Sequence, residues 1–303
     1  MLNFSGFAQK EANVWHFATS SATDFNSGVP VYNQNSAIVA SEGSASICDS
    51  SGVLQFYTNG ETVWNANHQV MVNGNGLDGW HSSVQPCVIT PDPAGCRRYY
   101  IFTADGRTSS PWGVPLMYDS VMTYSIVDMN LQNGLGEVVV KNQLLMTGID
   151  ERIAAVQHAN DKDYWVATHN PFSSSIHAFR VTANGVMPAV ISSMPFVSVP
   201  TMLKFSPNGK YIALAGFFPI ILEFNDTTGV CSNPIVMPST STGLATSCSF
   251  SPNSRYFYYS GDGDLRQADM QAANIPNSSI TVAAAGGMCS LQNAPDGKIY
   301  GAP

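Results

Sequence analysis

A short phrase occurs three times in the second half of the chain, and it constrains the fold more than any other feature. Phe205–Tyr211 reads Phe-Ser-Pro-Asn-Gly-Lys-Tyr. Phe250–Tyr256 repeats five of these seven residues, and Asn293–Ile299 keeps the Pro, Gly and Lys. The three copies begin 45 and then 43 residues apart. A fixed period of about 40–50 residues is typical of repeat architectures. The chain is therefore predicted to consist of repeated units.

Each copy predicts a β-hairpin. An apolar run precedes the phrase, a run rich in Tyr, Phe, Ile and Val follows it, and Asn or Asp before Gly supplies the positive φ angle of a tight turn. Weaker copies place further turns near residues 52, 95 and 161, in addition to those near 209, 254 and 297. Two more strand candidates lie between successive turns, such as Ser120–Val127 and Gly136–Val140. Four strands per repeat of this length is the blade of a β-propeller.

We therefore predict an all-β fold, a β-propeller of six blades with four antiparallel strands each, and seven blades as the alternative count. Residues 1–9 resemble the end of a signal peptide, and residues 10–303 form one domain. The N-terminal runs Asn13–Ala18 and Val29–Tyr32 are expected to complete the last blade, which would leave no open sheet edge. A β-sandwich with chance spacing of its turns is the competing interpretation.

Composition narrows the function classes. The chain of 303 residues has 21 acidic and 13 basic side chains and a net charge of −8. A protein that binds nucleic acid needs basic residues to neutralise phosphates, so this function is excluded. No apolar run reaches the 18 or more residues of a transmembrane helix.

The six cysteines form no CxxC pair and no zinc-site spacing. Cys48, Cys87, Cys248 and Cys289 lie in apolar runs, where they are expected to be small buried hydrophobic residues. The other two, Cys96 and Cys231, fall in expected turns, and the pairing of the cysteines stays open.

Two acidic residues are the best site candidates, because each directly precedes the first strand of a repeat. Glu42 and Glu151 hold these positions, and such positions face the axial channel of a propeller. Together with Gln85 and His158 they could hold a cation or a polar ligand, whereas water and structural hydrogen bonds would fill the channel otherwise. Beyond such a channel-bound cation, no cofactor is expected.

Exposed aromatic residues are a second group of candidates. Trp80, and Trp112 and Tyr118 in the inserted stretch Ala104–Asp119, would stack on sugar rings or pack on a protein partner if they lie on loops. Burial between blades is the alternative for all three. Gly74–Gly79 matches G-x-G-x-x-G, but no helical pattern follows it, so a dinucleotide site is not predicted.

Several phrases, taken together, resemble a known family. They are Asn13–Phe17, Cys48–Gly52, Leu54–Met71, Tyr124–Met129, His158–Val166 and Gln267–Met270. This series resembles the N-terminal propeller-like region of type IX-secreted surface proteins of gliding bacteria, in which PKD-type modules and a C-terminal sorting domain follow. The resemblance implies a secreted, cell-surface binding or adhesion module that is part of a longer polypeptide and has no settled enzymatic role.

The functional prediction is thus a non-enzymatic extracellular binding or scaffold module that takes a protein or polysaccharide ligand at one propeller face. The alternative is a lactonase-like propeller hydrolase with a metal at the channel mouth. Its expected ligands would be Glu42, His81, Glu151 and His158. An intracellular interaction propeller of the WD-repeat kind lacks the Trp-Asp signature.

Overall fold

The computed structural model describes residues 10–105, 120–195, 201–241, 243–261, 263–284 and 290–302. Nearly all regular structure in these ranges is β-strand, which confirms the all-β prediction. Three short 3₁₀ turns, Lys10–Ala12, Gln132–Gly134 and Pro276–Ser278, are the helical elements described. None of the described helical elements has the length and hydropathy to span a membrane.

The chain forms two compact units. One comprises the chain up to Ile153 together with Val181–Gly185, and the other comprises Ala154–Arg180 together with the chain from Val186 onward.

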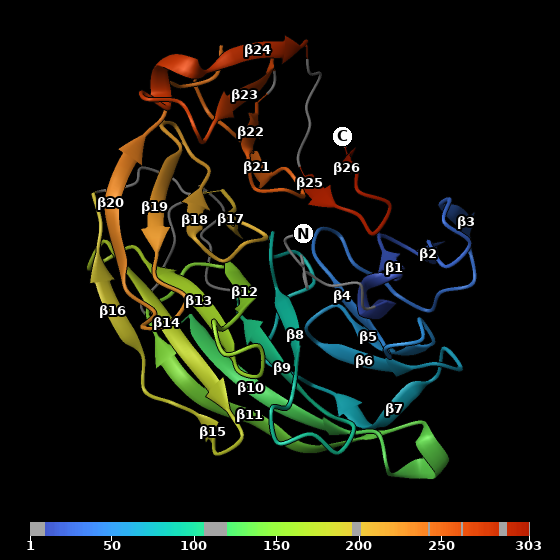
Figure 1. The fold of residues 1–303 in the computed structure, drawn as a ribbon. Helices are drawn as coiled ribbons and strands as arrows, with labels where there is room; N and C mark the ends of the chain where they lie inside the picture. Colours follow the sequence, from blue (N-terminus) through green and yellow to red (C-terminus); the bar gives the residue numbers. More distant parts are fainter. Residues whose placement is uncertain are drawn as a thin grey trace. The chain divides into compact units, whose positions relative to one another are not determined.

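The N-terminal part of the chain forms a three-stranded and an eight-stranded sheet (Figure 1). The first contains β1 (Val14–Phe17), β2 (Ser21–Asp24) and β3 (Val31–Asn33). The second contains β4 (Ala45–Cys48), β5 (Leu54–Thr58), β6 (Thr62–Asn65), β7 (Val70–Asn75), β8 (Cys87–Pro91), β9 (Arg98–Ala104), β10 (Val121–Asp128) and β11 (Glu137–Thr147). It consists of two antiparallel meanders, β4–β7 and β8–β11, which one parallel pair, Val72 with Glu137, joins at β7 and β11.

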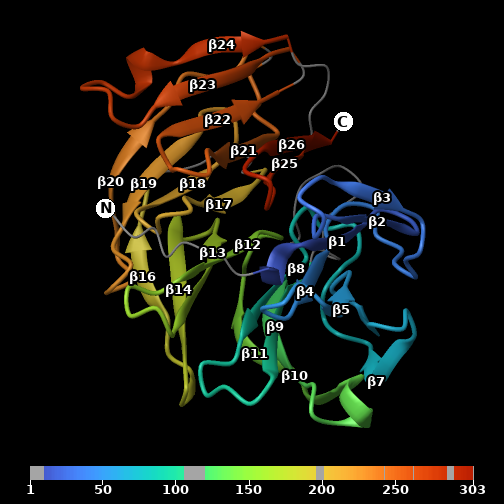
Figure 2. The same cartoon turned by 45° about the vertical axis from the view of Figure 1, so that its right-hand side comes forward.

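Four more sheets follow, and Figure 2 shows the later strands from a second side. A five-stranded sheet contains β12 (Ile153–Gln157), β13 (Tyr164–Asn170), β14 (Ser175–Thr182), β15 (Gly185–Val186) and β16 (Val190–Ser193). Two four-stranded meanders contain β17 (Leu203–Phe205), β18 (Tyr211–Leu214), β19 (Ile220–Phe224) and β20 (Cys231–Val236), then β21 (Ser247–Phe250), β22 (Tyr256–Ser260), β23 (Leu265–Asp269) and β24 (Ile280–Ala283). The last sheet pairs β25 (Ser290–Asn293) with β26 (Ile299–Ala302).

The predicted number of blades is wrong for the described strands. Four of their sheets have four or more strands, whereas six, or seven, four-stranded blades were predicted. The bridge between Val72 and Glu137 merges two meanders into one sheet, and β1–β3 and β25–β26 are too few strands for complete blades. The period in the sequence shows how many hairpins the chain forms. The number of sheets depends also on whether neighbouring meanders hydrogen-bond to each other, which the period does not show. Closure of the last blade by the N-terminal strands stays a prediction.

The six predicted turns are confirmed at the predicted residues. In each turn one residue has a positive φ, from 57° to 94°; these residues are Gly52, Gly95, Asp161, Gly209, Ser254 and Gly297. The N–H of each of these residues donates to the carbonyl three residues earlier, over 2.7 to 3.0 Å. That earlier residue in turn donates its own N–H to a backbone carbonyl at or just before the start of the following strand, over 2.7 to 2.9 Å. The recurring phrase is therefore the sequence of one closed hairpin turn.

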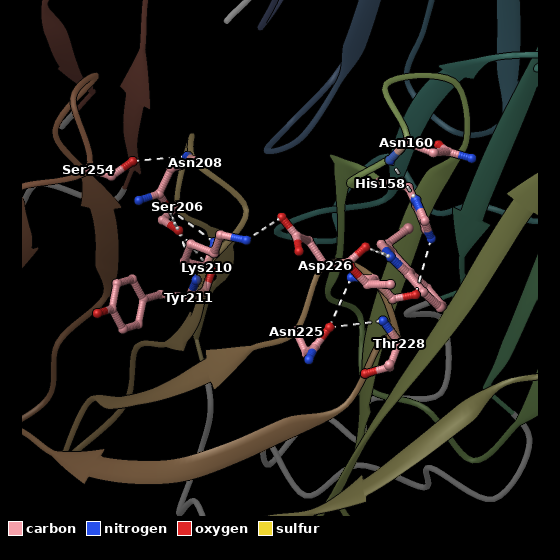
Figure 3. A network of polar contacts seen from close by, with 12 residues as sticks. His158, Asn160, Ser206, Asn208, Lys210, Tyr211, Asn225, Asp226, Thr228 and Ser254 are labelled. Carbon is pink, nitrogen blue, oxygen red and sulfur yellow. Dashed lines mark hydrogen bonds and ion pairs between the residues drawn. The ribbon is translucent and has the colours of Figure 1, made fainter. Parts of the chain in front are cut away.

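Side chains explain why the first two copies of the phrase share Ser, Asn and a basic residue (Figure 3). Ser206 Oγ accepts the N–H of Tyr211 at 2.9 Å and donates to Asn208 Oδ1 at 2.7 Å. Lys210 Nζ lies 2.7 Å from Asp226 Oδ2. The next copy makes the same contacts from Ser251, Asn253 and Arg255, whose guanidinium lies 3.2 Å from Asp269. The basic side chain of each pair is exposed to solvent, which weakens the ion pair, so the main effect of these contacts is to fix the turn geometry.

The hydrophobic core lies between consecutive meanders within each unit. One cluster combines Phe56, Met71 and Ile101 with other residues of β4–β11, and another combines Trp165 and Leu222 with other residues of β12–β20. Burial of each such side chain stabilises the fold by about 1.5–3 kcal/mol.

The five described cysteines are unpaired, and four of them are buried. Burial raises the pKa of Cys48, Cys87, Cys231 and Cys248 to about 12, so these thiols stay protonated. The prediction of buried hydrophobic cysteines is confirmed for Cys48, Cys87 and Cys248, whereas Cys289 lies outside the described residues. Cys231 opens β20 and does not lie in a turn.

A stacked aromatic group connects the first two sheets. The His16 ring on β1 stacks on the Tyr57 ring on β5, with centroids 3.9 Å apart and planes 3° from parallel, and Tyr57 stacks on Trp64 at 5.5 Å. Burial, with a smaller contribution from nearby His68, lowers the pKa of His16 from 6.5 to about 4. The folded protein therefore holds His16 neutral at a pH where the unfolded chain would protonate it.

A turn glycine offers the first test. Gly95 has φ +82° and open space where a Cβ would lie, so substitution by Ala should cost only the backbone strain, about 1 kcal/mol. Urea unfolding of Gly95→Ala should show this loss. Gly95→Asn should recover part of it, because Asn adopts the left-handed region more readily. Equal stability of the wild type and Gly95→Ala would contradict the role of positive φ in the turn.

Acid should destabilise the protein through His16. Because its folded pKa of about 4 lies below the unfolded value of 6.5, the unfolded state binds more protons in this window, and stability falls as the pH falls through it. The expected loss between pH 7 and pH 4 is about 3 kcal/mol. Urea unfolding at both pH values, for the wild type and His16→Asn, measures the difference. The variant should lose less stability on acidification, and parallel pH dependence in both proteins would refute the assignment.

Candidate functional site

Three segments that precede the first strands of successive repeats meet at one place. Ser41 and Glu42, before β4, donate their N–H groups to the carbonyl of His81 at 3.1 and 3.4 Å. Gln85, before β8, donates its N–H to the carbonyl of Glu151 at 3.3 Å and its amide Nε2 to the carbonyl of Ile153 at 3.3 Å. The structure thus brings Glu42, Gln85 and Glu151 together, as the pattern of acids before strands indicated. We call Glu42, Gln85, Asp150, Glu151 and Arg152 the carboxylate cluster.

A glycine allows these segments to approach closely. A Cβ on Gly43 would lie 2.1 Å from Cδ of Pro86 and 2.8 Å from the carbonyl oxygen of Val84. Any larger residue at position 43 would push the β4 segment away from the β8 segment. The backbone of Gly43 therefore packs against the ring of Pro86 and the carbonyl of Val84, and this contact positions Glu42 beside the residues that precede β8.

The carboxylate cluster carries more negative than positive charge. Arg152 lies 3.5 Å from Glu151 Oε1 and 3.9 Å from Asp150 Oδ2, and the Asp150 side chain is completely buried. The pKa of Glu42 is raised, first by partial burial and then by the negative charge of Glu151, while Arg152 and a hydrogen bond from Ser82 act in the opposite direction. Because Glu42 also meets solvent, water weakens this repulsion. One guanidinium thus faces three carboxyl groups.

His81 and Trp80 lie beside the cluster with their side chains engaged elsewhere. His81 Nδ1 lies 2.8 Å from Glu61 Oε2, so His81 pairs with Glu61 and not with Glu42 or Glu151. The Trp80 ring packs against the His81 ring at 4.7 Å, and Trp80 is half-buried. Trp112 and Tyr118 lie outside the described residues, so their proposed stacking role stays a prediction.

His158 belongs to a turn of the second unit, and its side chain contacts residues of that unit (Figure 3). That His158 shares a site with Glu42 and Glu151 stays a prediction. Its Nδ1 accepts the N–H of Asn160 at 2.9 Å, and its Nε2 lies 3.2 Å from the carbonyl of Thr227. Its ring also stacks on Trp165 at 5.6 Å. The sequence could not show this, because a His in a turn position has the same pattern whether it holds a ligand or closes the turn.

Other repeats show what His158 does. At the equivalent turn position, Asp49 Oδ1 accepts the N–H of Ser51 at 2.9 Å, and Asp92 Oδ1 accepts the N–H of Ala94 at 2.9 Å. His158 Nδ1 replaces these carboxylates as the acceptor two residues before the bonded N–H. His158 is therefore a turn-closing residue.

Both histidines expected as metal ligands in the hydrolase alternative have other partners. His81 pairs with Glu61, and both ring nitrogens of His158 are engaged in their own turn. Within the described ranges, no group of three or more His, Cys, Asp or Glu side chains has an arrangement that could hold a metal ion.

Sequence reasoning missed two members of the carboxylate cluster, Asp150 and Arg152. A signal was present, because Asp150–Arg152 is a run of three charged residues in a chain with only 11% charged residues. It also missed Glu61, for which the sequence offers no signal, since its pairing with His81 depends on how two loops meet.

Comparison with known proteins supports the fold. No protein-family model and no curated protein matches the chain. Among solved structures, a glucose dehydrogenase matches with a TM-score of 0.51 and 11% identity over 86% of this chain and 91% of that one. The Dos1 propeller matches with a TM-score of 0.51 and 10% identity over 93% and 70%. A functionally unknown protein from Desulfotomaculum acetoxidans matches with a TM-score of 0.50 and 10% identity over 93% and 89%.

The repeated antiparallel meanders and these similarities define the class: the chain has a propeller-type β fold. At 10–11% identity they show the fold alone, so the function rests on the side chains of this chain.

The structural role of His158 can be tested directly. His158→Phe keeps an aromatic ring on Trp165 but leaves the Asn160 N–H and the Thr227 carbonyl without this partner, at a cost on the order of 2–4 kcal/mol. His158→Asp should cost less, because Asp makes the same turn contact at residues 49 and 92. Thermal and urea unfolding measure both variants. Equal losses for Phe and Asp would contradict the turn-closing role.

Proposed function

We propose that the protein is a non-enzymatic binding module whose ligand contacts the carboxylate cluster. The excess of carboxyl groups over Arg152 carries this proposal. Carboxylate oxygens accept hydrogen bonds and do not donate them, so the cluster suits a ligand that presents hydroxyl or ammonium donors. A polysaccharide and a protein segment with exposed Lys side chains both have this chemistry.

The proposed setting is outside the cell, in a secreted surface protein of a gliding bacterium in which this chain is one part. The resemblance of the six sequence phrases supports it. Low charge content and a polar character that comes mainly from Ser, Thr and Asn agree with a role in recognition, since these residues form adaptable hydrogen bonds with polar polymers.

Binding by the purified protein tests the proposal. The protein is applied to immobilised polysaccharides, to a protein array and to bacterial cells, and bound ligands are then titrated. Glu42→Gln and Glu151→Gln keep the side-chain shape and remove the charge, and each should weaken binding about tenfold, which corresponds to 1.4 kcal/mol. Glu223→Gln, at an exposed glutamate on β19, is the matched control and should bind as the wild type does.

Other outcomes would overturn the proposal. Unchanged affinity in both cluster variants would remove the carboxylates from the binding site. Stoichiometric bound metal, together with hydrolysis of lactones or esters that Glu151→Gln abolishes, would establish the hydrolase instead. The binding arm also identifies the ligand class, because polysaccharide and protein are presented separately.

A further inference from the structure

A second candidate site lies in the N-terminal part of the chain. A partly open cavity of about 340 Å³ lies among β1, β2, the β4–β5 turn and the β6–β7 connection. This volume falls at the small end of the roughly 300–1,000 Å³ typical of small-molecule sites. Its polar lining residues are His16, Asp24, Asn26, Asn33, Asn35 and His68, and Val14, Ala22 and Leu54 are among the apolar ones. None of the residues of the carboxylate cluster lines it.

His16 supplies the observation that points to a ligand. The residue is only 4% exposed, and its Nδ1 lies 2.8 Å from Ser36 Oγ. Its other ring nitrogen, Nε2, is buried and has no hydrogen-bond partner among the residues that the structure describes. A buried polar atom without a partner costs about 1–3 kcal/mol, so such an atom on a residue that lines a cavity calls for an explanation.

Hydroxyl groups contact the Nδ1 atoms of both histidines. Ser36 Oγ accepts the N–H of Ile38 at 3.2 Å, and the Tyr57 hydroxyl accepts the N–H of Ala37 at 3.0 Å. The same two hydroxyl groups lie 2.8 Å from Nδ1 of His16 and 3.2 Å from Nδ1 of His68. A hydroxyl group both donates and accepts, so Nε2 of each ring is a donor in one tautomer and an acceptor in the other. The two neutral rings, 5.6 Å apart, can therefore each pair with a hydroxyl group of a ligand in either tautomer.

The neighbouring strands β2 and β3 supply further polar groups on the same face of the sheet as His16. Asp24 accepts the N–H of Asn26 at Oδ1 over 2.7 Å, and its carboxylate can only accept hydrogen bonds. Asn33 and Asn35 carry amides, which both donate and accept. The carboxylate disfavours an anion. An uncharged molecule with several hydroxyl groups suits the carboxylate, the amides and both rings, because each hydroxyl donates and accepts.

We propose that this cavity binds one uncharged sugar ring, whose hydroxyl groups pair with His16, His68 and Asp24 and whose C–H face lies on the apolar lining residues. The proposal is independent of the carboxylate cluster and does not require that cluster to bind a ligand.

Ligand-observed NMR on the purified full chain tests the proposal, with free glucose, galactose, mannose and N-acetylglucosamine as probes. Inorganic phosphate and methylammonium serve as charged probes of similar or smaller size. We expect saturable binding of at least one of the sugars and none of either ion. Glu42→Gln should leave sugar binding unchanged, which separates this site from the carboxylate cluster.

His16→Asn is the informative variant. Asn can keep the contact with Ser36 but has no group at the position of Nε2, so affinity for the bound sugar should fall at least tenfold. His177→Asn is the matched control, because His177 lies on β14 with its Nε2 3.0 Å from Ser175 Oγ, and it should bind sugar as the wild type does. Circular dichroism and thermal unfolding show whether each variant is folded.

A second variant decides the matter if His16→Asn fails to fold. Asp24→Asn preserves shape and can still accept the N–H of Asn26, but it removes the charged acceptor, and it should also weaken sugar binding at least tenfold. Absence of binding by all four sugars overturns the proposal. So does binding of phosphate in place of sugar, or wild-type affinity in a folded His16→Asn or Asp24→Asn protein.

Discussion

The hairpin turn with one left-handed residue is the constraint on which the rest of the structure depends. Two backbone hydrogen bonds close each turn, and they need a positive φ at the residue that Gly209 exemplifies. Once the turn is closed, the register of the two flanking strands is set, and alternate side chains are directed to the core. The position just before each hairpin is fixed as well, and this is how Glu42 and Glu151 come to share one site.

Local features of the fold could be read from the sequence, because they depend on residues near one another in the chain. The six turns follow from residues that tolerate left-handed backbone, and the buried cysteines follow from apolar runs. The number of sheets could not be read in this way. It depends on whether one meander bonds to the next, as at Val72 and Glu137, and no periodic signal records a single bridge between residues 65 positions apart.

In the candidate site, too, some features could be predicted from the sequence and others could not. The convergence of Glu42, Gln85 and Glu151 followed from their shared position before a strand. The partners of individual histidines could not be predicted from their positions in the sequence. His81 pairs with Glu61 and His158 closes a turn, and both arrangements depend on how loops meet. The sequence does not mark His16 as a site residue, since a histidine inside an apolar strand is usually a buried structural residue. Its unpartnered nitrogen becomes visible only when the cavity around it is known.

One copy of the repeat has Ser254 at the left-handed position of its turn. Ser254 occupies a left-handed position, with φ +58°, where Gly stands in most other copies. Its hydroxyl oxygen accepts the N–H of Asn208 in the preceding turn at 3.0 Å, which offsets part of the backbone strain. A departure from the consensus can thus record coupling between neighbouring copies and need not be decay of the repeat. Replacing all copies by one consensus phrase would erase this link, so the repeats are not interchangeable parts.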